Sequence, residues 1–352
     1  MTSDAVKSIA GAIRADNWFY WKIPPLFAVA YASFLLHGTD YRSALQELLL
    51  IFWCIASVAS YGHIINDVFD IEADRAGGKP NAMERFRPWQ RLTLCSLSVL
   101  SGLGALLYFT TNWMAAAVLM VNYLLPTVYS IPPLRLKERG VAGVVCDALG
   151  AHAVPVLFVL LTVSFFQQAS TLAEIGIGLS AIVWSLFAGL RSIVIHQVDD
   201  LLSDGRSDVI TFAGTQTRAS LRRLVLCYFL PVEAIALGVF TVLLMPFSEV
   251  LTIATLAYAV LEIGKVCAGM KMPIFFEESE VQERYLPLLN NSFYELWLPT
   301  ALLLQLCAMQ VEYLIIGLLH LLFFGALILH RGYLLLKMLH KFVFLTLSRL
   351  SR

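Results

Sequence analysis

The sequence predicts an all-α membrane protein, a multi-pass bundle of nine to ten transmembrane helices. Hydrophobic residues make up 59% of the 352 residues and charged residues only 14%, and the mean hydropathy is +0.74. Apolar runs recur along the whole chain, each close to the roughly 20 residues that a helix needs to cross a bilayer. Lys and Arg gather in alternate loops, which is typical of multi-pass membrane proteins. These features exclude an ordinary soluble domain, and we expect no nucleic-acid partner.

Ten apolar segments are the expected spans. They cover residues 18–37, 44–65, 90–110, 113–131, 141–166, 173–197, 221–245, 249–269, 293–310 and 313–330. Only Gln310-Val311-Glu312 separates the last two, so nine and ten crossings both remain open. We expect a single membrane domain over residues 1–352 with a motif-bearing core at 18–270. Residues 271–352 would add C-terminal spans and a basic amphipathic tail along the inner membrane surface.

Charge placement predicts how the bundle is oriented. The basic segments are the two termini and the loops near 66–91, 132–140, 199–223 and 265–292. Every Lys and Arg except Arg42 and Arg191 falls in these segments, so by the positive-inside rule they face the cytoplasm. Two cytoplasmic termini need an even number of spans, which favours ten. We expect an integral membrane protein, in the plasma membrane if its source is bacterial.

An acidic motif stands at the end of the second expected span. It reads Asn66-Asp67-Val68-Phe69-Asp70-Ile71-Glu72-Ala73-Asp74. On a helix, Asn66, Asp70 and Asp74 recur every four residues, and Asp67 lies three before Asp70, so the four side chains share roughly one face. Stacked carboxylates repel each other unless cations lie between them, and oxygen ligands suit Mg²⁺ that also holds phosphate groups. We therefore expect these four residues to bind metal at the membrane surface.

A second acidic motif follows the sixth expected span. It reads His196-Gln197-Val198-Asp199-Asp200-Leu201-Leu202-Ser203-Asp204. Asp200 and Asp204 repeat the four-residue interval and are the expected metal ligands of this helix. His196 lies four residues before Asp200 on the same face, where it fits either a substrate contact or an interfacial hydrogen bond. Asp199 points away from that face.

Basic residues follow the first motif and the fourth expected span. A Gly-Gly turn lets the backbone approach a ligand closely, and Lys79 beside it can reach a phosphate as a point charge. The stretch 129–137 reads Tyr-Ser-Ile-Pro-Pro-Leu-Arg-Leu-Lys, and its double proline forces a turn directly after the helix. Tyr129 would lie at the cytoplasmic rim, with Arg135 and Lys137 beyond it. The plainer alternatives are an interface anchor for Tyr129 and topology signals for the cations.

In this order, the two acidic motifs and the Pro-Pro turn resemble the UbiA superfamily of intramembrane prenyltransferases. The resemblance covers roughly residues 18–270. The proline-turn segment looks closest to the branch that includes chlorophyll synthase and the homogentisate and naphthoate prenyltransferases. After the first motif the family often shows Asn-Lys-Pro-x-Arg-Pro, where this chain has Gly78-Lys79-Pro80-Asn81-Ala82, and this departure bears on substrate identity.

The resemblance implies a helical bundle around a central cavity that opens near the cytoplasmic face. It also implies a Mg²⁺-dependent enzyme that ionises an isoprenoid diphosphate, with two or more ions bridging the diphosphate, and transfers the prenyl group to an aromatic or lipophilic acceptor. The implied metal ligands are Asn66, Asp67, Asp70, Asp74, Asp200 and Asp204. The implied catalytic residues are Asp67, Asp70, Asp200 and Tyr129. The implied diphosphate-binding residues are Asn66, Lys79, Arg135, Lys137 and His196.

Three other functions stay open beside this one. A terpene cyclase on the same scaffold would form a cyclic product from the diphosphate alone, without an acceptor. A polyprenyl-phosphate sugar-phosphate transferase would reverse which partner carries the diphosphate. A cation-coupled transporter would place its carboxylates near the bilayer midplane, whereas these lie at the cytoplasmic ends of spans, which argues against transport. The prenyl chain length, the acceptor and the oligomeric state do not follow from the sequence.

Ionisable residues inside expected spans are further candidates for function, because such residues are costly in a membrane. Several of them lie outside the motifs, among them Asp147, His152, Arg191, Glu233 and Glu262. We consider Asp147 a candidate partner of Arg191, whereas Glu233 and Glu262 belong to no motif.

Overall fold

The structure is a computed structural model that describes residues 11, 13–109, 112–204, 211–267 and 289–350. Within these residues every regular element is a helix, which confirms the all-α prediction. The chain divides into two compact units. Unit 1 comprises Met1–Phe19 and Gln46–Leu243, and unit 2 comprises Tyr20–Leu45 and Leu244–Arg352. The stretch 271–288, part of the expected C-terminal region, lies outside the described residues.

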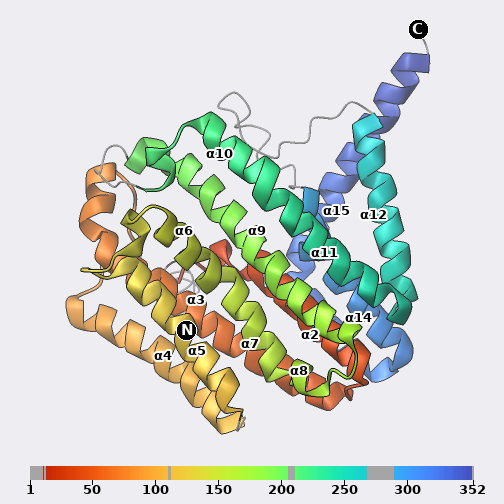
Figure 1. Cartoon of the computed structure of the whole chain (residues 1–352), viewed down its shortest axis with the longest axis horizontal. Helices are drawn as coiled ribbons and strands as arrows, with labels where there is room; N and C mark the ends of the chain where they lie inside the picture. Colours follow the sequence, from red (N-terminus) through yellow and green to blue (C-terminus); the bar gives the residue numbers. More distant parts are fainter. Residues whose placement is uncertain (1–10, 12, 110–111, 205–210, 268–288, 351–352) are drawn as a thin grey trace. The chain divides into compact units, whose positions relative to one another are not determined.

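Unit 1 is built from long helices joined by short turns (Figure 1). Its α-helices are α3 (Tyr41–Gly77, whose first turn belongs to unit 2), α4 (Pro88–Phe109), α5 (Trp113–Ser130), α6 (Val141–Ala148), α7 (Val154–Thr162), α8 (Phe165–Gln168), α9 (Leu172–Asp204), α10 (Arg218–Leu224) and α11 (Leu230–Leu244). Its 3-10 turns are η1 (Ala15–Asn17), η2 (Leu136–Glu138) and η4 (Ala213–Thr215). The π-helical turns η3 (Leu149–Ala153) and η5 (Val225–Phe229) join α6 to α7 and α10 to α11.

Unit 2 consists of helices from both ends of the chain. They are α2 (Phe19–His37), η6 (Met245–Phe247), α12 (Glu249–Cys267), α13 (Leu289–Ser292), the π-helical turn η8 (Phe293–Trp297), α14 (Leu298–Met309), η9 (Val311–Tyr313) and α15 (Leu314–Leu350). Buried polar contacts tie α15 to the rest of the unit. The hydroxyl of Tyr31 lies 3.1 Å from Nδ1 of His320, and Arg331 forms a 2.6 Å ion pair with Glu295.

Eight helices among the described residues are long and apolar enough to cross a membrane. They are Phe19–His37, Tyr41–Gly77, Pro88–Tyr108, Trp113–Ser130, Val141–Thr162, Leu172–Leu201, Arg218–Phe247 and Val311–Tyr333. The expected spans 249–269 and 293–310 correspond to α12 and to the shorter apolar helix Phe293–Met309, which are not among the eight. The multi-pass helical bundle is therefore confirmed. These two segments account for the difference between the eight candidate spans and the ten expected ones.

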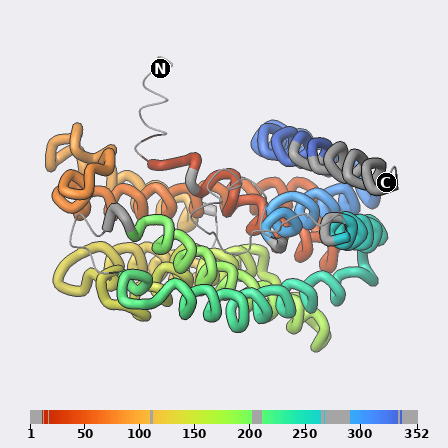
Figure 2. Tube along the Cα trace, turned by 90° about the horizontal axis from the view of Figure 1, so that it is seen from above, coloured from red at the N-terminus to blue at the C-terminus, as the bar shows by residue number. Residues whose placement is uncertain are grey.

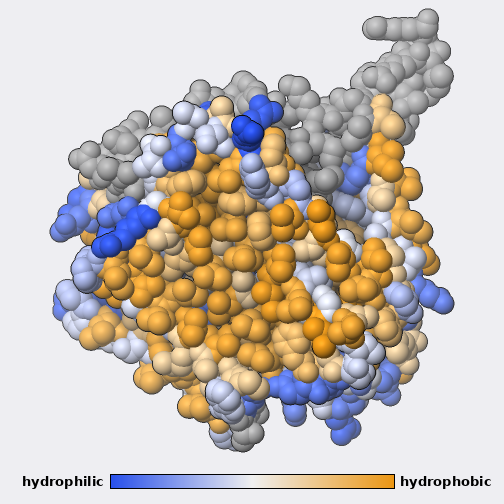
Figure 3. Space-filling view, viewed as in Figure 1, coloured by the Kyte–Doolittle hydropathy of each residue, from blue (hydrophilic) through white to orange (hydrophobic). Residues whose placement is uncertain are grey.

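The surface of unit 1 is that of a protein embedded in lipid. On the face shown in Figure 3, hydrophobic side chains cover the middle of the unit, whereas hydrophilic side chains gather at the helix ends. Leu100 and Leu107 on α4 and Val242 on α11 are more than half exposed. Together with the length of the apolar helices, this exposure indicates contact with lipid.

Local sequence signals explain where α5 begins and ends. The side-chain oxygen of Asn112 accepts a hydrogen bond from the amide of Ala115, as an N-cap does. Ile131 follows the last turn in an extended conformation, and Pro132 cannot continue the helix because it has no amide hydrogen. The turn after α5 therefore starts where the double proline predicts.

The helices that carry the two acidic motifs lie in different parts of unit 1. In Figure 2, α3 (orange) runs on one side of the unit, and α9 and α11 (green) run on the other. Helix α9 packs against α6, η3 and α7. Gly189 allows this close contact, because a Cβ atom there would lie 2.9 Å from the ring of His152 and 3.0 Å from Cα of Ala148.

Candidate active site

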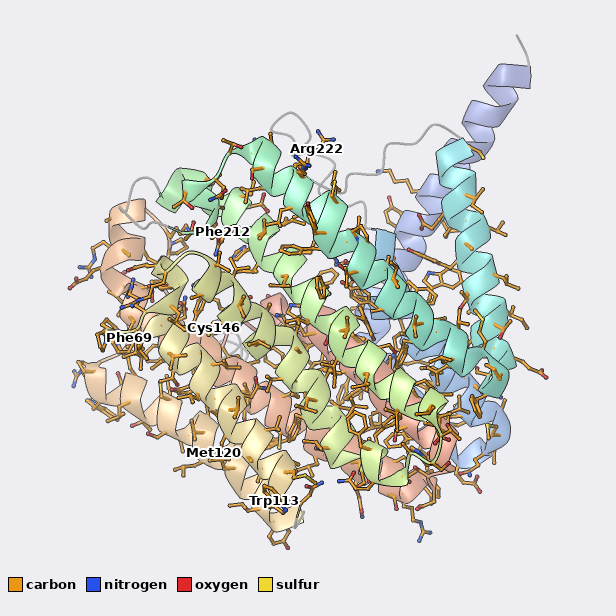
Figure 4. The ribbon with its side chains drawn as sticks, in the orientation of Figure 1. Phe69, Trp113, Met120, Cys146, Phe212 and Arg222 are labelled. Carbon is orange, nitrogen blue, oxygen red and sulfur yellow. The ribbon has the colours of Figure 1, made fainter. Side chains whose placement is uncertain are left out.

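The acidic motifs and the Pro-Pro turn meet at one end of unit 1. Figure 4 labels Phe69 in the last turns of α3, Cys146 on α6 and Phe212 just after α9, all toward the same end of the unit in that view. Trp113, the first residue of α5, lies at the other end. Chain segments that are far apart in the sequence are therefore available to build one site at the end with Phe69.

Asp70 and Asn66 of the first motif share a cation from the Pro-Pro turn. Nζ of Lys137 donates to Oδ1 of Asp70 and, at 3.1 Å, to Oδ1 of Asn66. Nη2 of Arg135 donates to the same Asp70 oxygen at 3.1 Å. The structure thus brings together four of the residues that the sequence predicts for the site.

Hydrogen bonds to backbone carbonyls hold the turn that carries Arg135 and Lys137. Nη1 of Arg135 donates to the carbonyl of Phe69 at 3.1 Å, and its own amide donates to the carbonyl of Ile131 at 2.9 Å. Gly143 of α6 packs directly under this turn, where a Cβ atom would lie 2.9 Å from Cα of Lys137. Burial lowers the pKa of Lys137, and the neighbouring Asp70 carboxylate opposes that shift.

Lys79 connects the two acidic motifs. Its Nζ lies 3.3 Å from Oδ2 of Asp200, although Lys79 follows α3 and Asp200 belongs to α9. Nε2 of His196 lies 3.7 Å from the same oxygen, one helical turn away, and the His196 side chain is 70% exposed. The sequence predicted the shared face of His196 and Asp200, and the structure adds the contact across the site.

Arg14 is a site residue that the sequence analysis did not single out. Asp67 is fully buried, and the Arg14 guanidinium meets it with two contacts, Nη2 to Oδ1 at 2.6 Å and Nε to Oδ2 at 3.1 Å. Nε1 of Trp18 donates to the carbonyl of Ile13 at 3.0 Å, which closes a local turn around Arg14. A lone arginine in a basic N-terminal segment gave no signal beyond membrane topology.

Asn81 is the second site residue that the sequence did not reveal as such. Its Nδ2 donates to Oδ2 of Asp74 at 2.7 Å and to the backbone carbonyl of Asp67 at 2.8 Å. Its Oδ1 accepts from the amide of Met83 at 2.8 Å. The signal in the sequence was its position directly after Pro80, where a side chain that bonds to nearby backbone is common in turns.

Tyr129 and Asp204 are the remaining predicted site residues. Tyr129 is half-buried in the last turn of α5. Its neighbour Ser130 donates a 3.3 Å hydrogen bond to Oδ1 of Asn66, so this turn does face the first motif. Asp204 is the last residue of α9, but its side chain lies outside the described residues.

A buried ion pair lies deeper in unit 1. Arg191 of α9 donates to both carboxylate oxygens of Glu233 of α11, from Nε at 2.6 Å and from Nη2 at 2.8 Å. Both side chains are almost completely buried. The sequence offered Asp147 as a candidate partner of Arg191 and gave no role to Glu233, so this pair is a finding of the structure.

The donor atoms of the site have the chemistry of a magnesium site. All of them are carboxylate or amide oxygens, the ligands that Mg²⁺ prefers. Within the described side chains no three His, Cys, Asp or Glu residues converge closely enough to hold an ion. Arg14, Lys137 and Lys79 each form an ion pair with one of the carboxylates. The donor set fits the metal, provided that these cations give up the carboxylates to it.

Comparisons with known proteins identify the fold and the family of the chain. A structure of a UbiA homolog from Archaeoglobus fulgidus bound to DMAPP and Mg²⁺ matches with a TM-score of 0.53 and 15% identity, over 84% of this chain and 99% of that one. A structure of a UbiA homolog from the same organism bound to GPP and Mg²⁺ matches with a TM-score of 0.54, 15% identity and the same coverage. At this identity the two matches show the fold. A search of curated proteins found no match.

A family model gives the stronger result. The model of the UbiA prenyltransferase family matches residues 26–271, more than half of the chain and nearly the whole range over which the motifs suggested the resemblance. The predicted resemblance is confirmed, while the branch within the superfamily stays a prediction. This chain is an integral membrane protein and an enzyme of the UbiA prenyltransferase family.

Proposed function

We propose that this protein transfers the prenyl group of an isoprenoid diphosphate to a lipophilic acceptor, with Mg²⁺ as cofactor. The observation that carries the proposal is the pairing of motif carboxylates with cations from three other segments. Carboxylates are what a divalent metal needs, and cations are what a diphosphate needs. A site that holds both in contact is suited to a metal–diphosphate complex. The similar structures of a UbiA homolog, bound to DMAPP or GPP with Mg²⁺, support the same substrate class.

The residues have separate tasks in this proposal. Asn66, Asp67, Asp70, Asp74, Asp200 and Asp204 would hold Mg²⁺, which when bound stabilises negative charge on the departing diphosphate. Lys79, Arg135 and Lys137 would donate to the diphosphate oxygens, which makes the diphosphate a better leaving group. Each of these three cations is already in contact with a motif carboxylate, so a small movement brings it to a ligand beside that carboxylate.

The remaining predicted residues would act at the edge of the site. Tyr129 would present an aromatic ring to the allylic cation that forms as the C–O bond breaks. His196, exposed and beside Asp200, would contact the diphosphate from the other motif. The basic loops predict that this edge faces the cytoplasm, with the prenyl chain lying among the apolar helices.

A mass-spectrometric assay tests the proposal. Purified protein with Mg²⁺ is incubated with geranyl, farnesyl and geranylgeranyl diphosphates, first alone and then with a panel of aromatic and lipid acceptors. We expect diphosphate release only when an acceptor is present, together with a prenylated product. A cyclic hydrocarbon formed without acceptor would instead make the protein a terpene cyclase. Turnover that persists in EDTA would contradict the role of the metal.

A further inference from the structure

The loop after α3 is anchored to the first acidic motif through one amide side chain. Both Nδ2 hydrogens of Asn81 are used, one on the Asp74 carboxylate at 2.7 Å and one on the Asp67 carbonyl at 2.8 Å. Its oxygen accepts from the amide of Met83 at 2.8 Å. An amide has two donors, so the donor capacity of Asn81 is spent within the motif.

This loop is built rigidly enough to position what it carries. Met83 is fully buried and packs against Ile64 of α3, with further apolar residues around the pair. Nε of Arg91 donates to the carbonyl of Met83 at 3.0 Å, and the amide of Lys79 donates to the carbonyl of Asp74 at 2.8 Å. The loop is therefore bonded on both sides of Asn81, to α3 through Lys79 and to α4 through Met83.

The partner of Asp74 differs in kind from the partners of the other motif carboxylates. Asp67, Asp70 and Asp200 each have a basic side chain within ion-pair distance. Within the described residues, the Asp74 carboxylate contacts the neutral amide of Asn81 and no cation. A neutral donor orients a carboxylate without cancelling its charge, whereas a guanidinium or ammonium group does both.

We propose that Asn81 is a positioning residue that holds the Asp74 carboxylate, with its charge uncompensated, ready for the metal ion. The inference rests on the proposed function, since it assigns Asn81 to the Mg²⁺ site of that reaction. Among the predicted metal ligands whose carboxylates are described (Asp67, Asp70, Asp74 and Asp200), Asp74 is then the one that can take the ion without first releasing a basic side chain. Groups that orient metal ligands in this way commonly change metal affinity about 10- to 100-fold when they are removed.

The test measures metal binding without turnover. Mn²⁺ binding to the detergent-solubilised protein is followed by electron paramagnetic resonance in the presence of inorganic diphosphate. We expect Asn81→Ala to weaken Mn²⁺ binding about 10- to 100-fold. In a double-mutant cycle, Asn81→Ala should weaken binding no further in the Asp74→Asn protein, because Asn81 acts through that carboxylate. The matched control is Asn112→Ala, which removes an amide with the same type of bonds, 2.8 Å to the Leu161 carbonyl and 3.2 Å from the Ala115 amide, far from the motif in sequence.

The outcomes separate this inference from the proposed function. Wild-type affinity in Asn81→Ala, or losses that add up in the double variant, would overturn the role of Asn81 and leave the proposed function standing. A wild-type protein that binds no Mn²⁺ with diphosphate would overturn both. Thermal unfolding of each variant guards against misfolding, because an effect of general destabilisation would appear in Asn112→Ala and would add to that of Asp74→Asn.

Discussion

Substitution of Gly143 by alanine should damage the site without touching a charged residue. Gly143 lies in α6 beneath the turn that carries Lys137, and a Cβ atom there would lie 2.5 Å from the carbonyl oxygen of Leu136 and 2.9 Å from Cα of Lys137. Cβ contacts under 3.0 Å are essentially never seen, and ordinary contacts begin at 3.4 Å. The turn must therefore move by about 0.5 to 0.9 Å, the difference between 2.5 Å and these two limits.

That movement is large on the scale of a catalytic site. Side chains in such sites need to be placed within about 0.5 Å, and a 1 Å misplacement can cost about 100-fold in rate. Lys137 and Arg135 both belong to this turn and would move with it. We therefore expect Gly143→Ala to lower transfer activity and the affinity for geranyl diphosphate by about 10- to 100-fold. Binding is measured by titration calorimetry in detergent with Mg²⁺, and activity by the mass-spectrometric assay.

Gly104 of α4 provides the control. A Cβ atom there meets nothing within 4 Å, so Gly104→Ala should keep wild-type binding and activity. It should also be slightly more stable, because alanine loses less conformational freedom than glycine when a helix forms. If Gly143→Ala folds and still binds geranyl diphosphate like the wild type, then the position of the turn does not matter and Lys137 is not a diphosphate-binding residue.

Three further predictions concern charge. Asp70→Asn and Asp200→Asn should each abolish turnover while the protein stays folded in detergent, whereas Asp199→Asn should remain active; full activity in either of the first two would remove that residue from the site. Arg191→Leu should lower the thermal unfolding midpoint strongly, since breaking a buried pair costs about 3–5 kcal/mol, and adding Glu233→Leu should restore part of the loss. A double variant less stable than the single one would contradict the assignment of the pair. Mn²⁺ and inorganic diphosphate should strengthen each other's binding about 5- to 150-fold, which is a typical coupling between two sites, and independent binding in calorimetric titrations would contradict it.

The parts of the site that follow from the sequence are those that local rules determine. Helical spacing places His196 on the same helix face as Asp200. The Pro-Pro pair determines where α5 ends, and therefore where the turn that carries Lys137 begins. Both rules depend on residues that are close together in the sequence, so they can be applied before the packing of the helices is known. The long apolar runs determine the helical bundle for the same reason.

The missed residues depend on packing between distant segments. Arg14 stands 53 residues before Asp67, and Glu233 stands 42 residues after Arg191. No periodicity connects such positions, so their pairing appears only when the helices are placed. In a membrane protein the difficulty is greater, because a basic residue near a helix end already has a sufficient explanation in topology.

The ion pairs also explain how the carboxylates of the first motif can lie close together in the fold. Asp67 is fully buried, a buried carboxylate is costly, and the ion pair with Arg14 offsets part of that cost. Lys137 is a buried cation. Burial lowers its pKa, whereas the neighbouring Asp70 carboxylate stabilises its charged form. If Asp70 turns to a metal ion, Lys137 loses that compensation and needs another anion in the same place. In the proposed function a diphosphate would supply it, so the binding of the metal and the binding of the diphosphate would each favour the other through the contact between Lys137 and Asp70.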